Sequence, residues 1–206
     1  MGENTSSIQS AAKQASKNNA LLEQHLHNIL SKDDQTRFQS HKVLESLSLE
    51  YPLVLYEHWD FLAGLLGSSN HYHRFIALSL VANLVSVDSK KKFEKIADAY
   101  FANIGGTRTM VAVQATVYAG KIAKAKPHLQ KRITNLLLLA DTVHQGKQTE
   151  LIKAAAIQAF DVYFETATDK KNIVEFVRAQ QESKSPKTRK AAKEFLQKWG
   201  TNHRSL

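Results

Sequence analysis

The sequence predicts an all-α fold built from about five antiparallel helical hairpins. One stretch, NHYHRFIALSLVANLVS at residues 70–86, places a cation at Arg74 and then Ala77, Leu80 and Leu84 at the third, sixth and tenth positions after it. That spacing puts the four side chains on one face of a helix. No part of the chain sustains the alternation of polar and apolar residues that a half-buried strand needs. We therefore expect helices throughout.

The same arrangement recurs four more times along the chain, each time behind a basic residue. The leading cations of these copies are Arg37, Lys153, Arg189 and, in a copy shifted by one residue, Arg108. Successive leading cations, Arg74 included, are 37, 34, 45 and 36 residues apart, a spacing typical of helical-repeat proteins. The loop at residues 145–148 gives the fourth hairpin the extra length that its long interval requires.

Capping residues, glycines and prolines predict the ends of the helices. Asp33 or Asp34 caps the second helix, Pro52 and Pro127 lie in first turns, and Gly105 and Gly106 form a loop. The predicted helices are residues 20–30, 35–50, 52–67, 70–86, 89–104, 107–125, 127–140, 149–166, 169–182 and 186–199.

The predicted organisation is one repeat domain over residues 19–200 with short segments on either side. Residues 1–18 are polar, and we expect them to be flexible or weakly helical unless they dock. Residues 201–206 form a C-terminal tail. A single hairpin cannot bury both of its apolar faces, so each repeat needs a neighbour, and Trp199 is expected to cover the core of the last one.

These copies resemble the HEAT-repeat family, in which a cation near the start of each second helix precedes small and aliphatic residues. The copies led by Arg37, Arg74, Arg108, Lys153 and Arg189 span most of the chain. Armadillo repeats have a similar spacing. The resemblance implies a right-handed α-solenoid, with the first helices on its convex side and the second helices on its concave side.

Charge is unevenly distributed between the halves of the chain. Residues 1–100 contain 11 acidic and 10 basic residues, whereas residues 101–206 contain 8 acidic and 18 basic residues. No acidic residue lies between Asp98 and Asp141. Such an imbalance suggests an acidic or polyanionic partner for the second half, although a basic surface without a partner is the alternative.

The composition argues against several classes of protein. The chain has no cysteine, which excludes disulfides and thiolate metal sites. Its apolar runs are too short to span a bilayer, so we expect a soluble, cytoplasmic protein. No nucleophile motif or phosphate-binding loop is present, and the histidines are poorly spaced for a metal. We expect no cofactor and no metal.

Polar residues on the second helices are the candidate binding residues, because solenoids usually hold their ligands on the concave surface. The predicted polar stripes are Ser79, Asn83 and Ser86; Gln114, Tyr118 and Lys121; Gln158, Asp161 and Glu165; and Lys190, Glu194 and Gln197. Two basic clusters, one near Lys121 and one at residues 184–193, add to them. The binding residues that we select are Gln114, Tyr118, Lys121, Lys124, Asp161, Lys187, Arg189, Lys190 and Lys193.

Two functions fit this pattern. The first is a non-enzymatic scaffold that docks a protein or another acidic partner on its concave face and basic C-terminal half. The second is a DNA-binding protein, since the chain is also similar in size, repetition and basicity to the HEAT-like DNA alkylation-repair glycosylases. Their chemistry needs a carboxylate and an aromatic face, for which Asp161 and Tyr118 are the best candidates. The sequence predicts neither the partner nor the oligomeric state.

Overall fold

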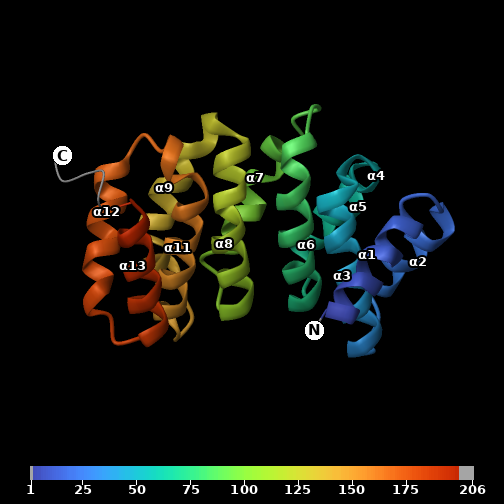
Figure 1. Ribbon diagram of the computed structural model, residues 1–206, viewed down its shortest axis with the longest axis horizontal. Helices are drawn as coiled ribbons and strands as arrows, with labels where there is room; N and C mark the ends of the chain where they lie inside the picture. The colour runs from blue at the N-terminus through green and yellow to red at the C-terminus, as the bar shows by residue number, and fades with distance from the viewer. Residues whose placement is uncertain (1, 200–206) are drawn as a thin grey trace. The chain divides into compact units, whose positions relative to one another are not determined.

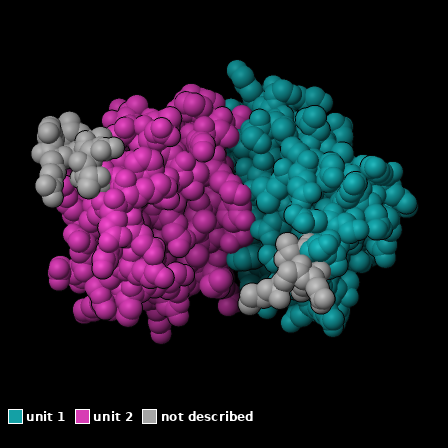
Figure 2. All heavy atoms as spheres, viewed as in Figure 1, with its two compact units in different colours: residues 1–97 teal, residues 98–206 magenta. Residues whose placement is uncertain are grey.

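The computed structural model describes residues 2–199, with side chains from residue 6 onward. Over these residues the chain forms α-helices joined by turns and short 3₁₀ helices and contains no strand, which confirms the predicted all-α class (Figure 1). The chain divides into two compact units, residues 1–97 and 98–206 (Figure 2). The single repeat domain and its solenoid form remain predictions, and the predicted tail at 201–206 lies outside the described residues.

Unit 1 is centred on α3, which contacts α1, α2, α4 and α6. Its helices are α1 (Gly2–Ala15), α2 (Asn19–Asn28), α3 (Asp34–Glu50), α4 (Pro52–Tyr56), α5 (Trp59–Gly64), η1 (Leu65–Gly67), α6 (His71–Leu84) and η2 (Val85–Val87). The segment that we expected to be flexible or weakly helical forms α1. Ala12 and Ala15 of this helix are fully buried, which is the docking that a polar helix needs in order to persist.

Unit 2 begins within α7 (Lys92–Ala102) and is centred on α11, which contacts α8, α9, α10 and α13. Its other helices are α8 (Thr109–Ala125), η3 (Pro127–Leu129), α9 (Gln130–Leu138), α10 (Ala140–Val143), α11 (Thr149–Tyr163), η4 (Phe164–Thr166), α12 (Lys170–Ala179), η5 (Gln180–Glu182) and α13 (Pro186–Trp199). Helices α8, α11 and α13 lie side by side in this order (Figure 1).

The predicted helix 52–67 is interrupted in the structure. Pro52 occupies the first turn of α4, as expected, but α4 ends at Tyr56 and the backbone leaves helical geometry at His58 before α5 begins at Trp59. The break lets the large Trp59 side chain be fully buried beside Tyr56, with ring centroids 5.5 Å apart. Tertiary packing therefore overrides a continuous helical pattern here.

One turn recurs before three of the second helices. In each copy a serine hydroxyl accepts a hydrogen bond from the backbone N–H two residues later, and the residue bearing that N–H caps the helix with its own side chain. The serine and the capping residue are Ser31 and Asp33 before α3, Ser68 and Asn70 before α6, and Ser183 and Ser185 before α13. In three of its five copies, the repeat detected in the sequence is therefore also a repeat of local structure.

The leading cation of these copies lies four residues after the capping residue. Arg37 donates to the carbonyl of Ser31 at 2.8 Å, and Arg189 donates to the carbonyl of Ser183 at 2.7 Å. The guanidinium thus ties the first turn of the helix to the preceding turn. The third and fourth copies lack this turn: Arg108 itself occupies the N-cap position of α8, and Lys153 forms ion pairs with Glu150 and Asp141.

Polar side chains lie between α3 and α6 inside unit 1. His41 Nε2 is 3.1 Å from the Ser79 hydroxyl, and the Asn83 amide donates to the Ser48 hydroxyl at 2.8 Å. Ser79 and Asn83 were expected to line an open surface, and that prediction is wrong because both are buried. Pairing with α3 satisfies their hydrogen bonds, so these two residues of the stripe form a helix contact, whereas the third, Ser86, is exposed as predicted.

Helices α8 and α11 of unit 2 are in close contact at Gly120. A Cβ atom added to Gly120 would lie 2.4 Å from the carbonyl oxygen of Ala159 and 2.8 Å from its Cα. Both helices also bury alanines near this contact, including Ala112, Ala119 and Ala155. Small side chains therefore let the two backbones touch over the middle of each helix.

We expect Gly120→Ala to destabilise the protein by at least about 2 kcal/mol, because the new methyl group meets backbone that cannot rotate away. Urea unfolding at constant temperature measures this change. Gly64→Ala is the matched control: nothing lies within 4 Å of its added Cβ, and Ala favours helix, so stability should stay constant or rise by up to ~1 kcal/mol. Equal effects of the two substitutions would contradict the close contact.

We also expect acid to destabilise unit 1 through His41. Burial lowers the pKa of the His41 imidazole from 6.5 to about 4; the nearby Glu45 opposes this shift and Lys42 adds to it. Below pH 6.5 the unfolded chain therefore takes up a proton that the folded chain does not bind, and stability falls until the pH reaches about 4. The loss due to His41 amounts to about 3 kcal/mol.

Comparison of the wild-type protein with His41→Gln isolates this effect from the titration of the carboxylates. The free energy of unfolding is measured by urea denaturation from neutral pH down to about pH 4. It should fall more steeply with falling pH for the wild type than for the variant. Parallel pH profiles of the two proteins would show that His41 is not the titrating group.

Candidate binding surface

The predicted binding residues all lie in unit 2, on three neighbouring second helices. Helix α8 carries Gln114, Tyr118, Lys121 and Lys124, helix α11 carries Asp161, and helix α13 carries Lys187, Arg189, Lys190 and Lys193. Because α11 contacts both α8 and α13, the structure brings these residues onto one row of helices. We call this row of α8, α11 and α13 the second-helix surface.

On α8, the predicted residues follow one side of the helix toward its C-terminus. Gln114, Tyr118 and Lys121 are half-buried, and Lys124 is exposed. The Lys121 ammonium lies 4.8 Å from the centre of the Tyr118 ring, within the range of a cation–π interaction. Cations near the end of a helix also complement its dipole, so this cluster has a structural role that needs no ligand.

Asp161 holds the last turn of α13 against α11. Its carboxylate accepts a hydrogen bond from the Trp199 indole N–H at 2.6 Å and forms an ion pair with Lys198 at 2.9 Å. The Trp199 ring packs on Phe164, with ring centroids 5.2 Å apart, so Trp199 does cover the terminal core. Both partners of the Asp161 carboxylate therefore lie in the last turn of α13.

The cations of α13 are exposed, but they are not equivalent. Arg189 donates to the carbonyls of Ser183 and Lys184, so its guanidinium maintains the turn before α13. Lys190 lies 3.8 Å from Glu194, one helical turn away. Within residues 2–199, Lys187 and Lys193 have no hydrogen-bonding or ionic partner. Lys187 and Lys193, with Lys190, remain the strongest binding candidates.

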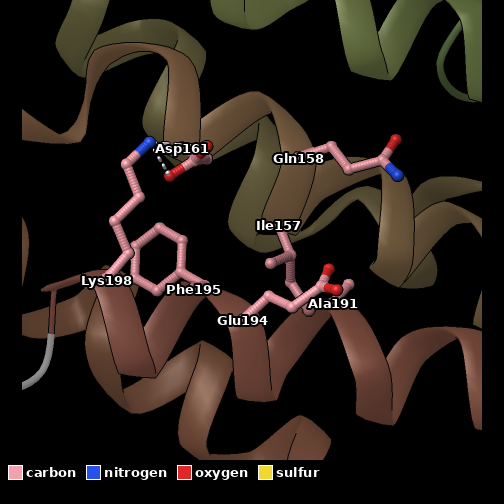
Figure 3. Close-up of a pocket in the computed structure, with 7 residues that line it drawn as sticks. All are labelled: Ile157, Gln158, Asp161, Ala191, Glu194, Phe195 and Lys198. Carbon is pink, nitrogen blue, oxygen red and sulfur yellow. Dashed lines mark hydrogen bonds and ion pairs between the residues drawn. The ribbon is translucent and has the colours of Figure 1, made fainter.

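A shallow groove of about 190 Å³ runs between α11 and α13 (Figure 3). Its lining residues are Ile157, Gln158, Asp161, Ala191, Glu194, Phe195 and Lys198. Figure 3 shows that Gln158 and Asp161 come from α11, whereas Ala191, Glu194 and Lys198 come from α13. Ile157 and Phe195 are buried and form the apolar floor, so the groove combines that floor with a rim of mixed charge.

The groove contains some residues that the sequence predicted and others that it did not. Gln158, Asp161 and Glu194 belong to the predicted stripes, but of the selected binding residues only Asp161 lines the groove. Lys198 was not selected, although its position one turn after Glu194 places it on the same helical face. Phe195 was expected only as a core residue, because the sequence cannot show that α13 leaves a gap beside it.

The chemistry of this surface suits binding. Its one central carboxylate, Asp161, already has two partners. Among the described residues, no group of three or more His, Asp or Glu side chains could hold a metal ion. The surface offers amide, carboxylate and ammonium groups for hydrogen bonding.

Every helix in the described part of the chain is too short or too polar to cross a membrane.

Comparison of the chain with protein-family models, with curated proteins and with solved structures found no match. The resemblance to HEAT repeats therefore depends on the repeated residues themselves and on the turns that they form.

We expect Asp161→Ala to loosen the last turn of α13 and to cost about 1 to 2 kcal/mol, since the indole N–H and the Lys198 ammonium lose their shared acceptor. Thermal unfolding measures the stability, and a red shift of the tryptophan emission reports exposure of Trp199. Asp98→Ala is the control: it removes an exposed ion pair with Arg132 and should change the stability by less than ~0.5 kcal/mol. A red shift equal in both variants would contradict the assigned contact.

Proposed function

We propose that this protein is a non-enzymatic, HEAT-like scaffold that docks an acidic protein segment on the second-helix surface of unit 2. The proposal depends mainly on three exposed lysines of α13, Lys187, Lys190 and Lys193. Within the described residues, only Lys190 of these three has a carboxylate partner. Lys187 lies in the first turn of α13, where the positive end of the helix dipole repels a cation. An external anion would relieve that repulsion.

The groove between α11 and α13 supports a protein segment as the partner. A peptide can place an apolar side chain over Ile157 and Phe195 and hydrogen-bond to Gln158. Its carboxylates can meet Lys187 and Lys190, which lie one helical turn before the groove residues Ala191 and Glu194. The capped turns support the HEAT-like part of the proposal, because three of the five sequence copies share the same turn before the second helix.

DNA binding is the alternative function, and it predicts different behaviour. Its favourable feature is the same excess of positive charge. The position of Asp161 does not support glycosylase chemistry, because the carboxylate is held by Trp199 and Lys198. A phosphate backbone also has no aliphatic side chain to cover the apolar floor of Ile157 and Phe195. We therefore favour the peptide.

Charge reversal of α13 tests the proposal, with a labelled peptide rich in Glu and Leu and a labelled DNA duplex as probes in fluorescence anisotropy. We expect the triple variant Lys187→Glu, Lys190→Glu and Lys193→Glu to weaken peptide binding at least about tenfold, since three attractions become repulsions. Arg189 is left unchanged because it holds the turn. The affinity for DNA should fall steeply with salt, whereas peptide affinity should fall less.

The control is Lys32→Glu, Lys90→Glu and Lys95→Glu, which makes the same change in net charge at exposed positions of unit 1. Equal losses in the two triple variants would point to nonspecific attraction and contradict the proposed surface. Tight DNA binding with a steep salt dependence, without peptide binding, would replace the proposal with its alternative. A base-excision assay on alkylated DNA would then follow.

A further inference from the structure

A second candidate surface lies on the outer face of α9, on a first helix and apart from the groove described above. Its residues are His128, Lys131, Arg132, Asn135, Leu136 and Leu139, and they line a shallow hollow of about 530 Å³. Their spacing of three and four residues places them on one side of the helix. We call this set the α9 stripe. The opposite side of α9, including Ile133 and Leu137, is buried in unit 2.

The first half of the α9 stripe carries cations where a helix does not favour them. Lys131 and Arg132 are the second and third residues of α9, and no acidic residue lies in its first turn. The helix dipole makes this end positive, so two cations there repel each other and are also repelled by the dipole. The helix dipole therefore does not account for these cations.

These two cations remain available to a ligand. Arg132 forms an ion pair with Asp98 and lies 5.4 Å from the centre of the Phe101 ring. The Asp98 side chain is 92% exposed, so this pair contributes little stability and can be exchanged for another carboxylate. Lys131 is exposed and has no ionic partner among the described residues.

The second half of the α9 stripe is apolar. The Leu139 residue is 54% exposed, and Leu136 beside it is partly exposed. Helix α9 thus has an apolar face toward the core and a second, shorter one toward solvent, which is unusual for a helix at a protein surface. Contact with a partner would remove both leucines from water.

We propose that the α9 stripe binds an amphipathic helix of a partner protein, with carboxylates facing Lys131 and Arg132 and aliphatic side chains facing Leu136 and Leu139. The stripe runs over residues 128–139, about 16 Å at the rise of an α-helix, so about three turns of a partner helix match its length. Charge complementarity and the apolar end of the stripe together select this occupant.

Other anionic partners fit this surface less well. A nucleic acid would satisfy the cations, but its backbone offers no aliphatic group to cover Leu139. A flat bilayer surface would not fill the hollow in which Leu136 lies. A helix with both carboxylates and aliphatic side chains satisfies both halves of the stripe.

The test uses the whole chain and a labelled helical peptide that carries Glu in its first two turns and Leu in its third, all on one face. We expect saturable binding in fluorescence anisotropy. Leu139→Ser and Lys131→Glu should each weaken it about tenfold, through loss of apolar contact and of charge attraction respectively. Both positions are exposed, so folding should be retained, as circular dichroism can verify.

Two matched variants and two further probes decide the outcome. Leu53→Ser and Lys171→Glu change an exposed leucine of unit 1 and an exposed lysine of α12, and they should leave the affinity unchanged. No saturable binding of the peptide to the wild type, or equal weakening by all four variants, would overturn the proposal. So would tighter binding to a DNA duplex or to phosphatidylserine vesicles that depends on the same α9 residues.

This test is separable from that of the second-helix surface. The α13 triple variant leaves the α9 stripe intact and should still bind the helical peptide within about twofold of the wild type. Loss of binding in that variant alone would assign the peptide to α13 and refute the α9 site. Loss in the α9 variants alone would support the α9 site whatever the function of the second-helix surface.

Discussion

The contact of Gly120 with Ala159 is the constraint on which unit 2 depends. Here the backbones of α8 and α11 meet with no side chain between them, as the 2.4 Å approach of a hypothetical Cβ shows. Two helices this close have room only for small side chains on their facing sides, such as Thr116, whose hydroxyl donates to the Ala112 carbonyl, so the larger polar residues lie on the flanks. Gln114 on α8 and Gln158 on α11 are such flanking residues, and the second-helix surface follows from this packing.

The basic residues of unit 2 divide into those that the fold uses and those that it does not. Arg189 holds a turn, Lys153 pairs with Glu150 and Asp141, and Lys198 pairs with Asp161. The net charge of the sequence does not distinguish these cations from ones that are available to bind a ligand. Lys187 and Lys131 have no such partner within the described residues, so they are stronger indications of a binding surface.

Local signals predicted most of the helices, because caps, prolines and helical spacing act over a few residues. Asp33 and Asn70 cap their helices as those signals require. These local signals do not predict long-range contacts. Nothing in the neighbouring sequence shows that Ser79 is buried against His41, or that α4 ends so that Trp59 can enter the core. The candidate site was predictable only as a set of exposed polar positions, and its groove depends on how α11 and α13 pack.

Helices α9, α12 and α13 of unit 2 share a conflict, and two of them, α9 and α13, carry the candidate sites. Each of the three begins with two basic residues in a first turn that has no acidic residue, against the preference of the helix dipole. Residues that are locally unfavourable for folding are expected at positions that serve binding or another function. The two sites differ in what lies beside the charge. Exposed Leu139 ends the α9 stripe, whereas Gln158 and Glu194 flank α13. A partner of α9 must therefore bring apolar area, and a partner of α13 must bring hydrogen-bonding groups.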